Sequence, residues 1–221
     1  MIRLDSIRLA DEEEEDPDMP SPAPAPKKAA EKPDETMRPG LAERLIDART
    51  IQISSDINDK VASRVIAELL VLEAADADKP ITIFLNSPGG SVTSGFAIYD
   101  VMRFITPPVR VVCMGLTASI ATVILMGARK ENRLALPNTR LLIHQPLIPM
   151  TVYGPASDLE ITAQEILKTR ARINEMLAAE TGQPLTRIEQ DTQRDYWLNA
   201  QEAVSYGLLA RVLKSRSEIG E

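Results

Sequence analysis

Histidine and cysteine are almost absent from this chain, which has one of each in 221 residues. Zinc sites are built from several His and Cys side chains, so no metal centre of this kind is expected. The single cysteine, Cys113, cannot form a disulfide within the chain, and its place in an apolar run is typical of a buried small side chain. This composition favours a reducing compartment, and we expect a cytoplasmic protein.

Aromatic residues are also scarce, at 4% of the chain, although 44% of the residues are hydrophobic. The core must therefore be built mainly from aliphatic side chains and methionine. A chain of this length can hold one substantial domain. Basic clusters are lacking as well, because 32 acidic residues outnumber 25 basic ones and give a net charge of −7. A nucleic-acid partner is not expected.

Long hydrophobic runs are missing from the chain, apart from one uncharged stretch. Residues 111–128 carry no charge and approach the length of a membrane-spanning helix. Gly115 and Ser119 fall inside this stretch, where a strand is predicted to give way to a helix. A buried strand followed by a buried helix explains the stretch, so no membrane partner is expected. No secretory signal is expected either, because charges interrupt the first apolar residues.

The first part of the chain differs from the rest in composition. Residues 11–16 are all acidic, and residues 20–30 are rich in proline and alanine. Such a segment cannot bury enough apolar surface to offset its ordering entropy. We predict a disordered arm or propeptide at residues 1–40, a folded domain at 41–214 and a short tail at 215–221.

Strands and helices alternate through the predicted domain. Short apolar runs predict strands at residues 50–54, 81–85, 109–114, 133–136, 140–144 and 210–213. Helical periodicity predicts helices at 58–75, up to 104, after 119, at 156–180, just before 195 and at 200–206. The alternation predicts an α/β fold with a largely parallel sheet covered by helices.

Ser119, His144 and Asp195 are candidates for nucleophilic catalysis. A serine hydroxyl needs a base to take its proton, and His144 is the only imidazole in the chain. Each residue also has an ordinary explanation: a helix cap, a structural histidine and a solvated carboxylate. The order Ser, His, Asp differs from that in chymotrypsin-like, subtilisin-like and α/β-hydrolase enzymes, so those folds are disfavoured.

The motif Asn-Ser-Pro-Gly-Gly-Ser-Val at 86–92 follows a predicted strand and opens a helix. Two glycines let backbone N–H groups approach a ligand closely. The motif is either a plain tight turn or one half of an oxyanion hole. In the second interpretation the N–H groups of Gly90 and Ile120 are the two donors.

Four longer motifs carry a resemblance to a known family, the ClpP family of Clp protease proteolytic subunits. They are Phe-Leu-Asn-Ser-Pro-Gly-Gly-Ser-Val-Thr-Ser-Gly (84–95), Cys-Met-Gly-Leu-Thr-Ala-Ser (113–119), Ala-Leu-Pro-Asn-Thr-Arg-Leu-Leu-Ile-His-Gln-Pro-Leu (135–147) and Thr-Gly-Gln-Pro-Leu-Thr-Arg-Ile-Glu-Gln-Asp-Thr-Gln-Arg-Asp (181–195). The resemblance covers about residues 41–213. It implies a ClpP/crotonase-like fold of repeated β-β-α units, with parallel sheet layers.

The resemblance also implies roles for individual residues. Ser119 corresponds to the nucleophile, His144 to the base and Asp195, rather than Asp191, to the acid. The oxyanion donors fall on Gly90 and Ile120. The implied activity is that of a self-compartmentalising serine endopeptidase that cleaves unfolded polypeptides, with no cofactor of its own.

The family's assembly is implied in the same way. Two seven-membered rings of identical subunits stack into a hollow barrel, and the long helix at 156–180 is the handle that joins them. Apolar pockets on the ring face dock a hexameric AAA+ unfoldase, which uses the ATP, since this chain has no phosphate-binding Gly-x-x-x-x-Gly-Lys pattern. The positions that correspond to the pocket lining are Phe84, Val112, Met114 and Leu134.

The chain departs from the family pattern in several places. Thr82 stands where the family often has tyrosine, and Ile-Ala-Thr follows Ser119 where Met-Gly-Ala is usual. The segment 148–157 is longer than usual and carries two prolines, which remove ladder donors from a strand. These departures motivate an alternative, a catalytically weak or structural subunit of a barrel mixed with a paralogue. A crotonase-type acyl-CoA enzyme is disfavoured, because those enzymes use glutamates.

Overall fold

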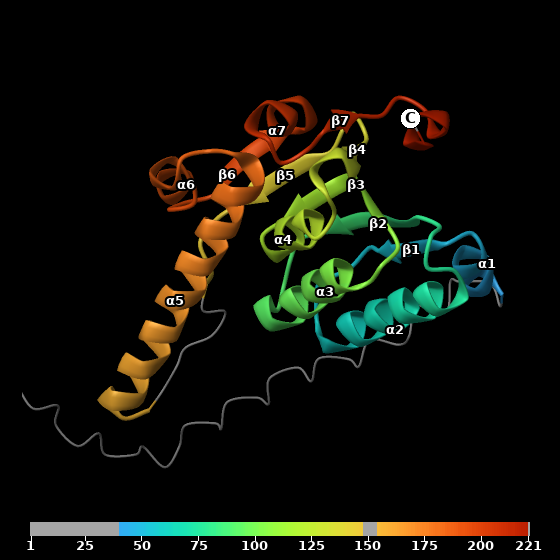
Figure 1. Ribbon diagram of the computed structural model, residues 1–221. Helices are drawn as coiled ribbons and strands as arrows, with labels where there is room; N and C mark the ends of the chain where they lie inside the picture. The colour runs from blue at the N-terminus through green and yellow to red at the C-terminus, as the bar shows by residue number, and fades with distance from the viewer. Residues whose placement is uncertain (1–39, 148–153, 221) are drawn as a thin grey trace, which may run out of the picture. The chain divides into compact units, whose positions relative to one another are not determined.

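The computed structural model describes residues 40–147 and 154–220, with the helices and strands labelled in Figure 1. The arm predicted at 1–40 lies, apart from Gly40, outside these ranges, as does the larger part of the segment 148–157. Within them, no helix combines the length and the apolar composition needed to cross a membrane.

The centre of the fold is a seven-stranded sheet. Five parallel strands follow one another in the order β1 (Thr50–Ile53), β2 (Ile81–Ser87), β3 (Val109–Ala118), β4 (Arg133–Ala135) and β7 (Arg211–Val212). Further along, β3 also pairs in parallel with β5 (Arg140–Ile143), and β5 pairs antiparallel with β6 (Tyr196–Asn199). The predicted, largely parallel sheet is confirmed, with β6 as its antiparallel member.

Helices and their caps follow the apolar periodicity of the sequence. The α-helices are α1 (Leu41–Asp47), α2 (Asp59–Ala75), α3 (Val92–Phe104), α4 (Ile120–Met126), α5 (Ala156–Thr181), α6 (Leu185–Asp191) and α7 (Ala200–Tyr206), and two short 3₁₀ helices are η1 (Lys130–Asn132) and η2 (Arg216–Gly220). Asn58 caps α2, because its side chain accepts the Val61 N–H at 3.0 Å.

The main core lies between the sheet and the helices α2, α3 and α4, which Figure 1 shows on one side of the strands. Side chains alternate along a strand, so Ile83 and Leu85 of β2 point into this core and Phe84 points to the other face. On β3, Val111 belongs to the main core, whereas Val112 belongs to a small second cluster. The sheet therefore buries apolar side chains on both faces.

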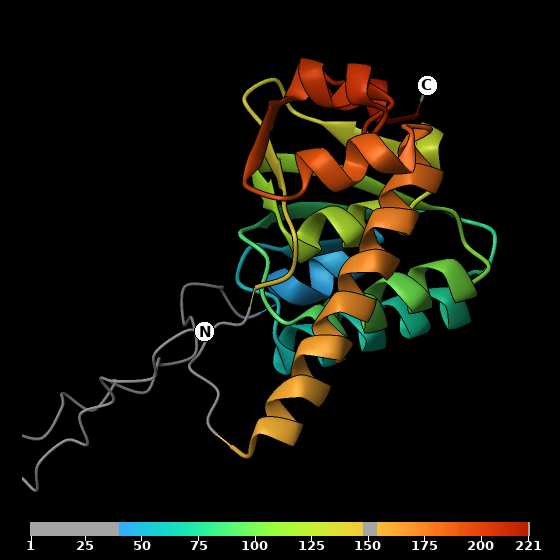
Figure 2. The same cartoon turned by 90° about the vertical axis from the view of Figure 1, so that its left-hand side faces the viewer.

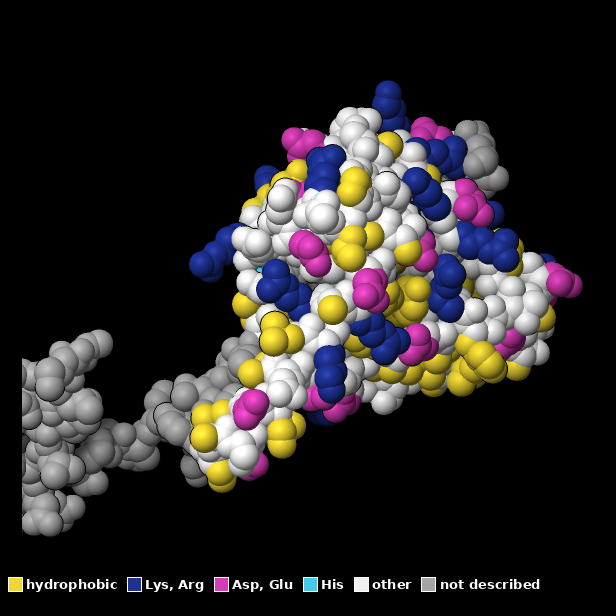
Figure 3. All heavy atoms as spheres, turned by 60° about the vertical axis from the view of Figure 1, so that its left-hand side comes forward, with side chains coloured by type: hydrophobic (Ala, Val, Ile, Leu, Met, Phe, Trp, Pro, Cys, Tyr) yellow, Lys and Arg dark blue, Asp and Glu magenta, His cyan; other side chains and the backbone are white. Residues whose placement is uncertain are grey.

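Helix α5 is packed against the body at one end only. Ile173 and Leu177 in its C-terminal half are buried, and the helix ends at Gly182, whose φ of 78° suits the left-handed cap position. Leu159, Ile161 and Leu167 in its N-terminal half are exposed. Figure 2 shows this half extending away from the sheet, and Figure 3 shows hydrophobic side chains along it. The long helix predicted at 156–180 is confirmed.

Some elements differ from the sequence prediction. Strands β2 and β3 continue to Ser87 and Ala118, past their predicted ends at residues 85 and 114. Gly115 is responsible in β3, because an irregular pairing at this point lets the strand bend and go on. Helix α1 and strand β6 were not predicted. Strand β6 has only four residues without apolar alternation, and it is stabilised by pairing with β5.

A buried ion pair joins the end of α5 to the sheet. The Arg133 side chain is fully buried, and it pairs with the Glu180 carboxylate at the end of α5. Its Nε also donates to the Ala128 carbonyl at 2.9 Å, and an Nη donates to the Met126 carbonyl at 3.3 Å. Arg103 lies 3.6 Å from the same carboxylate. Glu180 thus neutralises a guanidinium that has no access to water.

Removing this carboxylate should destabilise the fold. We expect Glu180→Ala to lower the free energy of unfolding by about 3–5 kcal/mol, because a buried charge loses its partner. Urea denaturation followed by circular dichroism measures the change. Glu175→Ala, an exposed glutamate on the same helix, is the control. Equal stability of the two variants would contradict the structural role given to Glu180.

Candidate active site

The pairing of three strands brings Ser119, His144 and Asp195 to one edge of the sheet. Ala118 at the end of β3 is paired with Leu142 of β5, so Ser119 and His144 follow the carboxyl ends of neighbouring parallel strands. Strand β6 runs antiparallel to β5 and pairs Tyr196 with Ile143. The residue before β6, Asp195, is thereby placed beside the residue after β5, His144.

The three side chains form a continuous hydrogen-bonded chain. His144 Nε2 lies 2.8 Å from Ser119 Oγ, and His144 Nδ1 lies 3.1 Å from Asp195 Oδ1. In the tautomer with hydrogen on Nδ1, the imidazole donates to the carboxylate and accepts from the serine hydroxyl. The His144 side chain is 13% exposed, whereas that of Asp195 is 62% exposed. The serine thus has a base within reach.

Asp191, the other aspartate of the motif, is engaged elsewhere. Its carboxylate accepts the Tyr206 hydroxyl at 2.8 Å and lies 3.5 Å from Arg187. Burial, together with this hydrogen bond, raises the pKa of Tyr206 well above its usual value. The structure therefore places Asp195, and not Asp191, against the imidazole.

The backbone of Ser119 has an uncommon conformation. Its φ of 57° and ψ of −127° lie in a region that residues with a side chain rarely occupy. The Ser119 N–H donates to the Leu142 carbonyl at 2.9 Å, and the Ser119 carbonyl accepts the Thr122 N–H and hydroxyl at 3.0 and 2.7 Å. These bonds hold a sharp turn from β3 into α4 and present the hydroxyl at its apex.

The two glycines of the Ser-Pro-Gly-Gly motif make close backbone contacts, Gly89 with Ser119 and Gly90 with Ile57. A Cβ on Gly89 would be 2.7 Å from Ser119 Cβ, and a Cβ on Gly90 would collide with the Ile57 carbonyl. The Ile57 N–H donates to the Gly89 carbonyl at 2.7 Å, and the Ser91 N–H donates to Ile57 at 2.8 Å. Only glycine permits this approach, which explains the two consecutive glycines of the 86–92 motif.

Two N–H groups, those of Gly90 and of Ile120 directly after Ser119, have no hydrogen-bond partner among the described residues. The hydrogen bonds among the described residues do not use the Gly90 N–H. The Ile120 N–H is at the first position of α4, where a helix leaves its N–H groups without intrahelical partners. Gly95 contacts Ile120 so closely that no side chain fits between them, which fixes the start of α4 against α3.

Two positions in this region, Asn86 and Gly115, were missed as site residues. The Asn86 Oδ1 accepts the Leu116 N–H at 3.0 Å, and a Cβ on Gly115 would lie 2.8 Å from the same oxygen. The pairing of β2 with β3 shifts at this point. Asn86 therefore bridges the strand leading to the glycine pair and the strand leading to Ser119. An isolated glycine inside a strand was the available signal.

The residues predicted to dock a partner lie on the sheet face away from α2, α3 and α4. Phe84, Val112 and Leu134 belong to one cluster. Met114 lines a neighbouring cavity of about 350 Å³, which Phe84 shares. Val112 and Leu134 are buried, at 0% and 1% exposure, so only part of the predicted set is accessible.

Nitrogen and sulfur ligands for a metal are few in the described ranges, which contain one histidine and one cysteine. No cluster of three or more His, Cys, Asp and Glu side chains there could hold a metal ion. Cys113 lies within β3, where burial raises the pKa of its thiol to about 12. At neutral pH the thiol therefore stays protonated and is a poor nucleophile.

Comparisons with known proteins find similar sequences and a similar structure. A sequence model of the Clp protease family matches residues 35–216. The ATP-dependent Clp protease proteolytic subunit 1 of Bacillus cereus is 49% identical over 173 residues, which are 78% of this chain and 89% of the relative. The structure of a ClpP1 mutant from Listeria monocytogenes matches with a TM-score of 0.74 and 44% identity, covering 81% of this chain and 99% of that one.

These matches extend over the sheet, α5 and the segment that carries Ser119, His144 and Asp195. The fold prediction is confirmed, since the structure shares the ClpP/crotonase-like fold of that neighbour. The family match covers well over half of the chain. The chain belongs to the Clp protease family.

Proposed function

We propose that this chain is a self-compartmentalising serine endopeptidase that cleaves unfolded polypeptides through Ser119, His144 and Asp195. The observation that carries the proposal is the 2.8 Å contact between His144 Nε2 and Ser119 Oγ, in a chain with no other histidine. Membership of the Clp protease family supports it. The alternative of a structural subunit is not favoured, because the nucleophile, its base and the acid that orients the base are in contact.

Acylation follows from the positions of these groups. Ser119 Oγ attacks the scissile carbonyl carbon, and its proton passes to His144 Nε2. Asp195 accepts the hydrogen on Nδ1, which fixes the tautomer and stabilises the imidazolium. The carbonyl oxygen becomes an oxyanion that the N–H groups of Gly90 and Ile120 stabilise. His144 then donates its proton to the leaving amine as the C–N bond breaks.

Deacylation uses the same groups in the second half of the cycle. A water molecule gives a proton to His144 Nε2 and attacks the ester carbonyl, and the same N–H groups stabilise the second oxyanion. The intermediate collapses when the bond to Ser119 Oγ breaks and His144 returns the proton to that oxygen. The carboxyl product leaves, and the serine hydroxyl is regenerated without any cofactor.

The assembly is part of the proposal. The exposed apolar side chains of the projecting half of α5 support a role in stacking two seven-membered rings into a barrel, because such side chains are normally covered by a partner. The relative from Bacillus cereus is named an ATP-dependent protease subunit. We infer that a hexameric AAA+ unfoldase delivers substrates to the face that carries Phe84 and Met114. We also place the protein in the cytoplasm.

Hydrolysis of a short fluorogenic peptide by the purified protein tests the function. Short peptides can enter such a barrel without an unfoldase. We expect Ser119→Ala to lose at least about 10⁴-fold in kcat, because the nucleophile is removed. Ser55→Ala, at an exposed serine, is the control and should keep its activity. Equal hydrolysis by the wild type and Ser119→Ala would overturn the proposal.

The two aspartates of the motif offer a matched pair of substitutions. We expect Asp195→Asn to lower kcat by about 10⁴-fold, because an amide favours the wrong tautomer of the imidazole. Asp191→Asn should change kcat only a few-fold, since its partners are Tyr206 and Arg187. Steady-state kinetics with the same peptide measure both. A greater loss in the Asp191 variant would reverse the assignment.

Gly89→Ala tests the close approach of Gly89 to Ser119. The added methyl group would lie 2.7 Å from Ser119 Cβ, so the loop and the oxyanion donor beside it must move. We expect kcat/KM to fall by about 10²-fold or more, the cost of losing one donor. Gly154→Ala is the control, because its nearest neighbour is 3.8 Å away. Full activity in folded Gly89→Ala would show that this contact is not required.

A further inference from the structure

The sheet face opposite the main helices is covered in an unusual way. Parallel sheets normally bury both faces, usually under helices. Val112 of β3 and Leu134 of β4 are almost completely buried on this face. The apolar residues that pack against them are Phe84 on the neighbouring strand and two residues of the C-terminal segment, Leu213 and Ile219. The end of the chain therefore covers the middle of this face.

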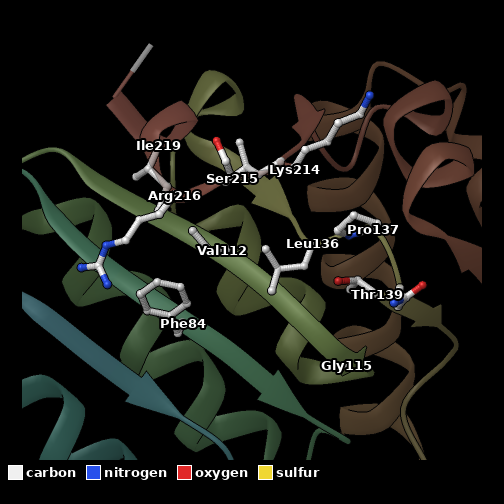
Figure 4. Close-up of a pocket in the computed structure, with 12 residues that line it drawn as sticks. Phe84, Val112, Gly115, Leu136, Pro137, Thr139, Lys214, Ser215, Arg216 and Ile219 are labelled. Carbon is white, nitrogen blue, oxygen red and sulfur yellow. The ribbon is translucent and has the colours of Figure 1, made fainter.

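The C-terminal segment, residues 213–220, is positioned by the pairing of the strand that precedes it. Strand β7 pairs with β4, and the Leu213 N–H donates to the Ala135 carbonyl at 2.8 Å. The chain then turns into η2, and Ile219 packs against Val112 and Leu134. Figure 4 shows Arg216 and Ile219 above Val112 and Phe84. Leu213 is fully buried, whereas Ile219 is only partly buried.

A cavity of about 490 Å³ lies beside Ile219. The sheet contributes Phe84 and Val112 to its lining, the loop after β4 contributes Leu136, and the C-terminal segment contributes its residues from Lys214 to Arg216 together with Ile219. The cavity and the cluster share Phe84, Val112, Leu213 and Ile219. Withdrawal of the segment would join the cavity and the cluster into one larger apolar site.

The segment is held by polar contacts at the surface. The Glu218 carboxylate accepts the Lys214 N–H at 3.0 Å and the Ser215 hydroxyl at 3.2 Å. The Lys214 N–H bond is the main reason why the pKa of Glu218 lies below its usual value. The Glu218 carbonyl also accepts a hydrogen bond from Arg211 at 2.7 Å. Water competes for contacts of this kind, so they can open and close without unfolding the sheet.

We propose that residues 214–220 are a displaceable cover of the docking face, which must move before a partner can occupy the place of Ile219. This inference rests on the proposed function, in which a partner unfoldase docks on this face. Ile219 itself shows the chemistry that the site accepts, an aliphatic side chain against Val112 and Leu134. The apparent affinity of the partner is then reduced by the fraction of molecules in which the cover is closed.

Binding of the apolar dye anilinonaphthalene sulfonate measures how open the site is. The chain shortened to end at Leu213 should bind the dye about tenfold more tightly than the full chain, a change of the size expected for uncovering part of an isoleucine site. Glu218→Ala should shift the dissociation constant in the same direction, because the segment loses its carboxylate contacts. Glu131→Ala, an exposed glutamate far along the chain from this segment, is the control and should match the wild type.

Competition by a synthetic peptide identifies the site. The peptide with the sequence of residues 214–220 should displace the dye from the shortened chain, and the same peptide carrying Ile219→Ser should not. Equal dye affinity in the full chain, the shortened chain and Glu218→Ala would overturn the proposal. So would equal displacement by the two peptides.

Peptide hydrolysis separates this proposal from the proposed function. All of these variants should hydrolyse a short peptide at the wild-type rate, since none of the changed residues touches Ser119, His144 or Asp195. Absence of peptidase activity in the wild type would count against the enzyme, while the dye measurements would still decide whether the segment is a cover.

Discussion

The pairing of β3, β5 and β6 is the constraint on which the candidate site depends. Ser119 and His144 follow parallel strands whose ends are in register, and the bond from the Ser119 N–H to the Leu142 carbonyl locks that register at the site itself. Antiparallel β6 then returns the chain so that Asp195 meets His144. A shift of one residue between these strands would turn the side chains to the other face and separate the three groups.

Backbone close packing sets a second condition on the site. Gly89 approaches Ser119, Gly90 approaches Ile57, and Gly95 approaches Ile120, at distances that exclude any side chain. Asn86 fills the irregularity in the sheet between these segments with a side-chain oxygen that accepts the Leu116 N–H. The strained backbone of Ser119 is tolerated because the surrounding hydrogen bonds determine its position. The turn that presents Ser119 and the adjacent glycines is thus positioned mainly by main-chain contacts.

Much of this arrangement could be predicted from local patterns, and the rest depends on contacts between distant residues. The apolar periodicity predicted α2 and α5. The motifs identified Ser119, His144 and Asp195 as candidates, and the structure brings these three residues together. Strand β6 was missed because its short sequence acquires strand geometry only by pairing with β5. The contact of Asn86 with Leu116, and the burial of Arg133 under Glu180, join segments 30 and 47 residues apart and leave no local signal.

The attachment of helix α5 at one end only has a consequence for how its other end can move. It contains 26 residues and is therefore roughly 39 Å long, but among the described residues its buried side chains lie in its last third. Such a helix is anchored at its C-terminal end, where Glu180 pairs with Arg133. A tilt of about 10° at this end would displace the N-terminal end by roughly 7 Å, given the length that the helical rise implies. Small adjustments of packing beside the sheet can thus be amplified into large movements at the far end.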